Sequence, residues 1–97
     1  MKQLTSHELK NWTDTGKDFL LIDIREDWER EAYHIGSLHI PMGELISRID
    51  ELPKDKEVVL YCEKGIRSVI AIQRLETFGF NNLFNLSGGM KRWRESQ

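Results

Sequence analysis

The chain has 97 residues, enough for one small domain that we expect to span residues 1–97. Its 39% hydrophobic content can supply one modest core, and its net charge of −2 is spread over 31% charged residues of both signs. Nucleic acid is therefore not expected as a partner, and no apolar run approaches membrane-spanning length. Residues 1–6 lack the apolar core of a signal peptide, so we expect a cytoplasmic protein whose thiol stays reduced.

The first half of the chain predicts short strands alternating with short helices. Lys2–Leu4 suits an edge strand, and Ser6–Thr13 suits a helix whose capping box would include Glu8. Phe19–Ile24 is a nearly continuous apolar run, which is typical of a strand buried on both faces of a parallel sheet. Asp27–Ala32 follows as a short charged helix, with Asp27 expected as its cap.

The second half continues the alternation and ends in a helix that opens at Gly88-Gly89. The expected elements are a strand at Ser37–Ile40, a helix at Glu44–Leu52, a strand at Val58–Tyr61, a helix at Ser68–Phe78 and a strand at Leu83–Leu86. This order predicts an α/β fold: a single small domain with a central, mainly parallel sheet of about five strands and helices on both faces.

The chain's only cysteine, Cys62, lies between a predicted strand and a predicted helix. A lone cysteine at a strand end is most often a small buried hydrophobe. Here, however, Gly65 allows a tight turn, and Lys64 and Arg67 place two cations near the sulfur. A loop that leads into a helix N-terminus presents N–H groups to anions, so a thiol in this loop is expected to ionise readily.

One cysteine also limits the chemistry. No intramolecular disulfide or dithiol cycle is possible, so whatever group Cys62 picks up must be released to an external acceptor. The histidines at positions 7, 34 and 39 show no zinc-ligand spacing with Cys62, and we expect neither a metal nor another cofactor. A role for His34 or His39 as the base of a Cys–His dyad is the less favoured reading, since their segment has a structural pattern.

Four separated motifs together resemble a single-domain rhodanese, over essentially the whole chain. They are Leu21-Ile22-Asp23-Ile24-Arg25-Glu26, His34-Ile35-Gly36-Ser37-Leu38-His39-Ile40-Pro41, Cys62-Glu63-Lys64-Gly65-Ile66-Arg67-Ser68 and Leu86-Ser87-Gly88-Gly89-Met90-Lys91-Arg92-Trp93. The second motif is one residue shorter than the family pattern, which puts the wall of the site beside Gly36-Ser37 in question. Each motif alone is weak evidence, and all four in order are strong evidence.

The resemblance implies a thiosulfate sulfurtransferase-like enzyme in which Cys62 takes a sulfane sulfur as a persulfide. The loop residues implied to bind the substrate are Glu63, Lys64, Gly65, Ile66, Arg67 and Ser68. In the family the backbone N–H groups of this loop cradle the anion and the arginine closes it, while Asp23 and Arg25 are implied as supporting groups. The implied partners are a small anionic sulfur donor and a thiophilic acceptor, which can be a protein that carries a persulfide. Glu63 would repel anionic donors and partly offset Lys64.

Two alternatives stay open. The chain could be a sulfur carrier without turnover, or a binding module that docks to a partner protein. It could also be a phosphatase or an arsenate reductase, but the loop of such enzymes is one residue longer between the cysteine and the arginine. Four residues separate Cys62 from Arg67 here, which gives a tighter cradle that suits a single sulfur better than a tetrahedral oxyanion.

Overall fold

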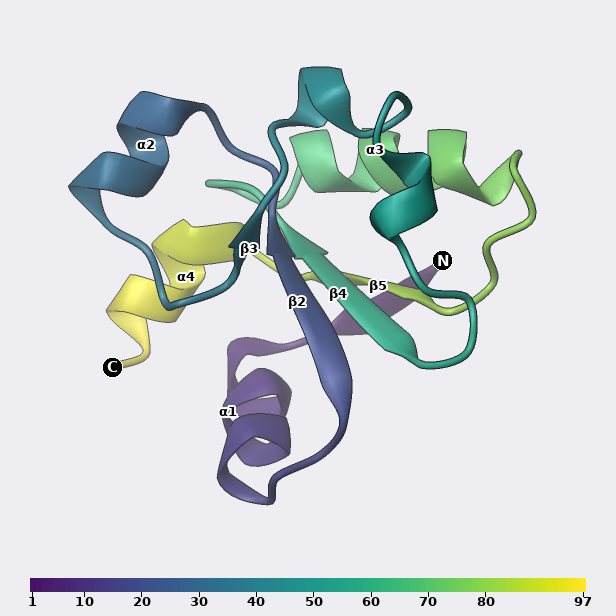
Figure 1. The fold of residues 1–97 in the computed structure, drawn as a ribbon. Helices are drawn as coiled ribbons and strands as arrows, with labels where there is room; N and C mark the ends of the chain where they lie inside the picture. The colour runs from purple at the N-terminus through teal and green to yellow at the C-terminus, as the bar shows by residue number, and fades with distance from the viewer.

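The computed structural model describes residues 1–97 and confirms the α/β fold with a five-stranded parallel sheet. The strands are β1 (Lys2–Leu4), β2 (Phe19–Asp23), β3 (Leu38–His39), β4 (Glu57–Tyr61) and β5 (Leu83–Leu86), in the spatial order β1-β5-β4-β2-β3. The helices are α1 (Ser6–Asp14), α2 (Asp27–Ala32), α3 (Arg67–Glu76) and α4 (Gly89–Glu95). Figure 1 shows α3 and α1 on opposite sides of the sheet.

Alternate residues of the central strand β4 supply two separate cores. Val58 and Leu60 pack with residues of α3, including Ile72 and Leu75. The intervening residues Val59 and Tyr61 face the other way and pack with Leu9 of α1 and Met90 of α4. Because the side chains of a strand alternate between faces, a strand that is apolar at every position must be covered on both sides. The helices on both faces follow from that pattern.

Two local expectations differ from the structure. Instead of one helix over Glu44–Leu52, the chain forms two 3₁₀ turns, at Met42–Glu44 and Ile49–Glu51. The hydroxyl of Ser47 donates to the carbonyl of Glu44 at 2.9 Å, and such local bonds compete with regular helix formation. Apolar side chains of the segment, such as Leu45, still belong to the core that packs against α3. The hydrophobic spacing therefore predicted correctly which side chains are buried, but not the backbone conformation.

The second difference concerns the start of α2. The residue at the N-cap is Glu26 rather than Asp27, and the backbone N–H of Glu26 donates to Oε1 of Glu29 at 3.0 Å. Glu29 is thereby fixed at the first turn of α2. This fixation matters because Glu29 also reaches the loop that contains the cysteine.

The topology brings the carboxyl ends of β2 and β4 side by side. Asp23 is paired with Tyr61 in the sheet register, and the N–H of Ile24 donates to the carbonyl of Tyr61 at 3.0 Å. The turn after β2 and the loop after β4 therefore leave the same edge of the sheet, as the predicted topology requires.

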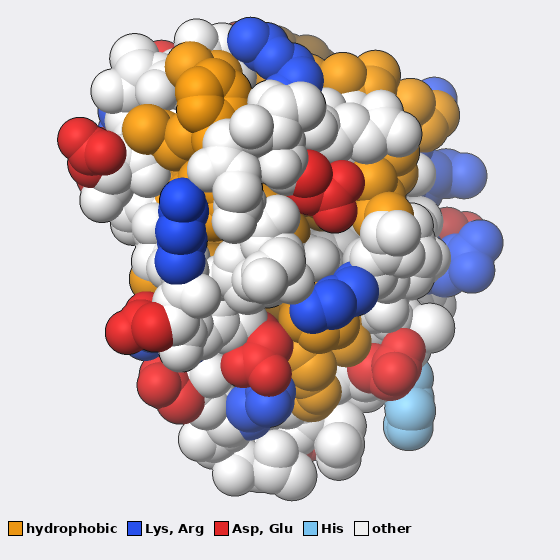
Figure 2. Space-filling view, turned by 90° about the vertical axis from the view of Figure 1, so that its right-hand side faces the viewer, with side chains coloured by type: hydrophobic (Ala, Val, Ile, Leu, Met, Phe, Trp, Pro, Cys, Tyr) orange, Lys and Arg blue, Asp and Glu red, His pale blue; other side chains and the backbone are white.

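The surface mixes charges of both signs. Figure 2 shows basic and acidic side chains interspersed with hydrophobic ones over the face that it presents, without a field of one sign. None of the helices is long and apolar enough to cross a membrane.

Candidate active site

The sulfur of Cys62 lies directly after β4, in a loop that supplies it with backbone donors. The side chain is buried, with 1% of the residue exposed. The N–H of Gly65 donates to Sγ at 3.1 Å and the N–H of Ser68 donates to it at 3.3 Å. Two amides that converge on one sulfur stabilise negative charge there. The loop thus has the anion-cradling geometry that the sequence predicted for its backbone.

A polar network behind the sulfur was not predicted from the sequence. Oγ of Ser68 lies 3.3 Å from Sγ, and its hydroxyl donates to the side-chain oxygen of Asn85 on β5. The Asn85 amide nitrogen donates to the side chain of Gln3 on β1 at 3.0 Å and to the carbonyl of Gly65 at 3.4 Å. Asn85 is a buried polar residue in an otherwise apolar strand. This break in the apolar pattern was the signal in the sequence that a polar partner is present. The network fixes Ser68 and the turn at Gly65.

The first turn of α4 supports the loop from the opposite side. The N–H of Met90 donates to the carbonyl of Cys62 at 2.9 Å, and the N–H of Lys91 donates to the carbonyl of Glu63 at 2.8 Å. Gly65 has a φ of +85°, and a Cβ on it would lie 3.0 Å from the backbone nitrogen of Gly88. The loop and the Gly-Gly turn are therefore in backbone contact, which explains structurally why small residues occur in both motifs.

Arg67 is held by a carboxylate from α2. Its Nη1 and Nη2 donate to the two oxygens of Glu29 at 2.8 and 2.7 Å. The hydrogen bond from Arg67 holds the pKa of Glu29 below its usual value, and the same bond raises the pKa of Arg67. The bidentate pair joins α2 to the start of α3 and places the guanidinium at the pocket of Cys62. Glu29 is the second residue that sequence reasoning missed.

We expect the Glu29→Gln variant to make Cys62 more reactive toward iodoacetamide in mildly acidic buffer, by a severalfold increase in rate. The amide keeps the shape of the side chain but removes the charge that offsets Arg67, so the positive potential at the sulfur rises and stabilises the thiolate that attacks iodoacetamide. Glu31→Gln is the matched control, because Glu31 lies on the same helix and lines a different pocket. Equal alkylation rates in the parent and both variants would show that Arg67 exerts no electrostatic effect on the sulfur.

Asp23 and Arg25 form a buried ion pair, with 0% and 1% of each residue exposed. Nε and Nη2 of Arg25 donate to Asp23 at 3.0 and 2.9 Å. Burial is the largest single influence on Arg25 and lowers its pKa, but the hydrogen bond and the charge of Asp23, with smaller contributions from Tyr61 and Glu63, together raise the pKa of Arg25 above its ordinary value. Removing one partner of such a pair leaves an uncompensated buried charge, at a cost of about 3–5 kcal/mol.

The same arginine reaches the cysteine loop through Glu63. Nη1 of Arg25 donates to Glu63 at 3.2 Å, and Arg94 of α4 also pairs with that carboxylate. The carboxylate expected to repel anionic donors is thus compensated by two guanidinium groups. Lys64, in contrast, is exposed and makes no ion pair. The sequence suggested that Glu63 would partly offset the charge of Lys64, but Glu63 pairs with the two arginines instead.

The short segment around Gly36-Ser37 forms an ordered wall behind Arg25. Oγ of Ser37 lies 2.8 Å from the hydroxyl of Tyr61, and Nη1 of Arg30 donates to the same Oγ at 3.1 Å. Burial raises the pKa of Tyr61 to about 12, so its hydroxyl stays protonated at neutral pH. Although this segment is one residue shorter than the family pattern, side-chain hydrogen bonds close the wall.

A pocket of about 370 Å³ opens in front of the sulfur. It is lined by Glu29, Cys62, Glu63, Lys64, Ile66 and Arg67. All but Glu29 belong to the loop predicted from the sequence. We call this space the Cys62 pocket. It brings one sulfur, one free ammonium and one paired guanidinium together, which suits a small anionic reactant.

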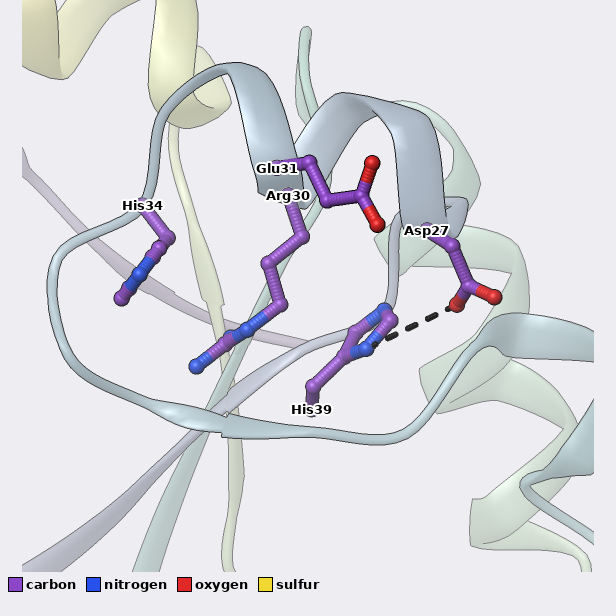
Figure 3. A pocket seen from close by; sticks show the side chains of 5 residues that line it. All are labelled: Asp27, Arg30, Glu31, His34 and His39. Atoms are coloured by element: carbon purple, nitrogen blue, oxygen red, sulfur yellow. Dashed lines mark ion pairs between the residues drawn. The ribbon is translucent and has the colours of Figure 1, made fainter.

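The histidines line a separate pocket of about 350 Å³ on the other side of α2, with Asp27, Arg30 and Glu31 (Figure 3). Nε2 of His39 donates to the carbonyl of Arg25 at 2.8 Å, and its Nδ1 lies 3.8 Å from Asp27. Nδ1 of His34 accepts from the N–H of Gly36 at 3.0 Å. Neither ring is a partner of Cys62, so this structure contains no Cys–His dyad.

Comparison with known proteins agrees with this geometry. The model of the rhodanese-like domain matches residues 5–96. YtwF of Bacillus subtilis, named a putative sulfurtransferase, is 35% identical over 94 residues, covering 96% of this chain and 90% of YtwF. The structure of the human single-domain sulfurtransferase TSTD1 is 26% identical with a TM-score of 0.87, covering 100% of this chain and 98% of TSTD1.

The probable adenylyltransferase/sulfurtransferase MoeZ of Mycobacterium tuberculosis is 34% identical over 93 residues. The match covers 93% of this chain but only 24% of MoeZ, so the chain spans about a quarter of that relative. The chain belongs to the rhodanese-like domain family, and both YtwF and TSTD1 are named sulfurtransferases.

Proposed function

We propose that this protein transfers a sulfane sulfur from a donor to a nucleophilic acceptor through a persulfide on Cys62. With thiosulfate as donor, the Cys62 thiolate attacks the outer sulfur, the bond between the two sulfurs of thiosulfate breaks, and sulfite leaves with the electron pair. A nucleophile such as cyanide then attacks the outer sulfur of the persulfide. The sulfur–sulfur bond breaks, thiocyanate leaves and the thiolate of Cys62 is regenerated.

The observation that carries this proposal is the pair of backbone amides of Gly65 and Ser68 that converge on the sulfur of Cys62. These donors are fixed by the fold before any substrate arrives, so they stabilise the thiolate that attacks and the thiolate that leaves. No general base is required when the thiol is already ionised. The absence of histidine from the partners of Cys62 is consistent with this mechanism.

The surrounding charges would attract and orient an anionic donor. Lys64 is free to approach it, and Arg67 is held at the pocket by Glu29. Asp23 and Arg25 would act indirectly, because Arg25 pairs with the carboxylate of Glu63 and offsets its charge at the pocket. The remaining loop residues Gly65, Ile66 and Ser68 would shape the cradle. Since the chemistry needs a reduced thiol, we propose that the protein works in a reducing compartment such as the cytoplasm.

The test is the intact mass of the protein after incubation with thiosulfate and again after cyanide. We expect a gain of one sulfur atom per chain, located on Cys62 and removed by cyanide. A polysulfide is used as a second donor, so that poor reaction with thiosulfate alone is distinguished from an unreactive cysteine. Failure to gain sulfur from either donor would contradict the proposal. Loading without turnover would support a carrier role instead.

A further inference from the structure

The Cys62 pocket continues into a second depression of about 420 Å³ between α2 and α4. The two spaces share Glu29 and Glu63 as lining residues. We call the second space the α2–α4 groove; the rest of its lining is Arg25, Trp28, Ala32, Tyr33 and Arg94. A donor or acceptor of a few atoms needs only the first space, so the groove requires another explanation.

The mouth of the combined depression has exposed apolar side chains on both sides. Trp28 of α2 is 71% exposed in the groove, and Ile66 of the cysteine loop is 65% exposed at the Cys62 pocket. Tyr33 continues the apolar surface, with the guanidinium of Arg94 5.6 Å from the centre of its ring. Exposed tryptophan beside a pocket is a frequent feature of protein interfaces, where its large rigid surface contributes much of the binding energy.

The charges near the groove favour an acidic partner. The carboxylates of Glu29 and Glu63 are each already paired with arginine. Lys64 on the loop and Lys91 on α4 are exposed and make no ion pair, and the backbone of Lys91 contacts Glu63. Asp27 and Glu31, which are also on α2, line the separate pocket shown in Figure 3. Glu26, at the N-cap of α2, is a carboxylate near Arg67 that makes no ion pair. The free charges around the loop are therefore two ammonium groups against one carboxylate, so positive charge predominates there although the whole chain has a net charge of −2.

We propose that the α2–α4 groove docks an extended acidic segment of an acceptor protein, whose cysteine receives the sulfur from Cys62. The inference rests on the proposed function and specifies the acceptor. The acceptor thiolate attacks the outer sulfur of the persulfide, the bond to Cys62 breaks, and the acceptor leaves as the persulfide while Cys62 returns to the thiolate. Trp28 and Ile66 provide apolar contacts, and Lys64 and Lys91 meet the acidic side chains.

The experiment uses two synthetic peptides of equal length, each with one central cysteine, flanked by Asp and Glu in one and by Lys and Arg in the other. The full chain is loaded with sulfur, and transfer is followed by the masses of protein and peptide. We expect transfer to the acidic peptide to be at least about tenfold faster at low salt, with the difference reduced at high salt. Equal rates for the two peptides would overturn the inference.

Variants locate the docking surface. Trp28→Ala is expected to slow transfer to the acidic peptide by about tenfold or more without changing transfer to cyanide. Lys91→Glu is expected to slow transfer to the acidic peptide by about tenfold or more, and by a larger factor than it slows transfer to cyanide. Phe78→Ala and Lys56→Glu are the matched controls: Phe78 is 50% exposed just beyond α3, Lys56 lies before β4, and neither lines the groove. Unchanged transfer in Trp28→Ala and Lys91→Glu would contradict the assignment of the groove.

A binding measurement separates this inference from the proposed function. The acidic peptide is made with serine in place of its cysteine and a fluorescent label, and its anisotropy is followed as the protein is added. Binding that weakens in Trp28→Ala would support the groove even if Cys62 accepted no sulfur. No binding of this peptide, in a protein that does form a persulfide, would overturn the docking surface and leave the sulfurtransferase proposal intact.

Discussion

Replacing Cys62 with serine is expected to abolish sulfur loading and transfer while leaving the fold intact. The hydroxyl can still accept from the amides of Gly65 and Ser68, so the loop keeps its internal hydrogen bonds. A serine hydroxyl is not ionised near neutral pH, and no base lies within reach to activate it. We expect thiocyanate formation to fall by at least about a thousandfold, as for other enzymes that lose their nucleophile.

Thermal unfolding provides the structural control for this variant. A change from sulfur to oxygen in a buried position that keeps its hydrogen-bond donors is expected to shift the Tm by less than about 5 °C, which for a domain of this size corresponds to roughly 1 kcal/mol. Ser68→Ala is a matched comparison, because it removes the neighbouring hydroxyl and retains the thiol. Transfer that persists in Cys62→Ser would show that the sulfur is carried elsewhere.

The sheet was predictable because its signals are local. Phe19–Ile24 and Val58–Tyr61 are apolar at successive positions, and only a strand covered on both faces accommodates such a run. The capping box between Thr5 and Glu8 is present in the structure, as the sequence indicated. The helix predicted over Glu44–Leu52 was wrong. Apolar spacing indicates which side chains are buried, whereas the backbone there forms local 3₁₀ hydrogen bonds.

The loop of the candidate site was equally accessible to sequence reasoning, because Cys62, Gly65 and Arg67 lie within six residues of one another. The residues that hold this loop come from other parts of the chain. Glu29 on α2 and Asn85 on β5 are polar residues whose role cannot be recognised from the residues next to them in the sequence. Which distant side chains meet depends on the packing of whole elements, and one sequence contains no direct record of that packing.

The charge at Glu63 illustrates the same limit. From sequence neighbours alone, the carboxylate appears beside Lys64 and the sulfur and would oppose an anionic donor. The fold adds Arg25 from the turn after β2 and Arg94 from α4, and these two cations offset the charge of Glu63. Electrostatic conclusions about a site therefore need the groups that tertiary structure adds, which here come from both ends of the chain.

The contact between α4 and the cysteine loop leads to the other large effect: Gly89→Ala is expected to slow sulfur loading by at least about tenfold and to lower the Tm. Gly89 has a φ of +59°, where an alanine costs about 1–2 kcal/mol. Its Cβ would also collide with the carbonyl of Cys62 and lie 2.7 Å from the carbonyl oxygen of Glu63. Because both neighbours are backbone atoms, the loop itself must move, and the amides of Gly65 and Ser68 move away from the sulfur with it.

Gly16→Ala distinguishes this collision from simple backbone strain. Gly16 also has a positive φ, +71°, but a Cβ there would meet nothing within 4 Å. In this control, the free energy of unfolding should fall only by the cost of placing alanine at a positive φ, and sulfur should be loaded at the parent rate. The rate of alkylation of Cys62 should likewise fall in Gly89→Ala and stay unchanged in Gly16→Ala. If both variants load sulfur equally well, the start of α4 does not position the loop, and the hydrogen bonds from Met90 and Lys91 serve stability alone.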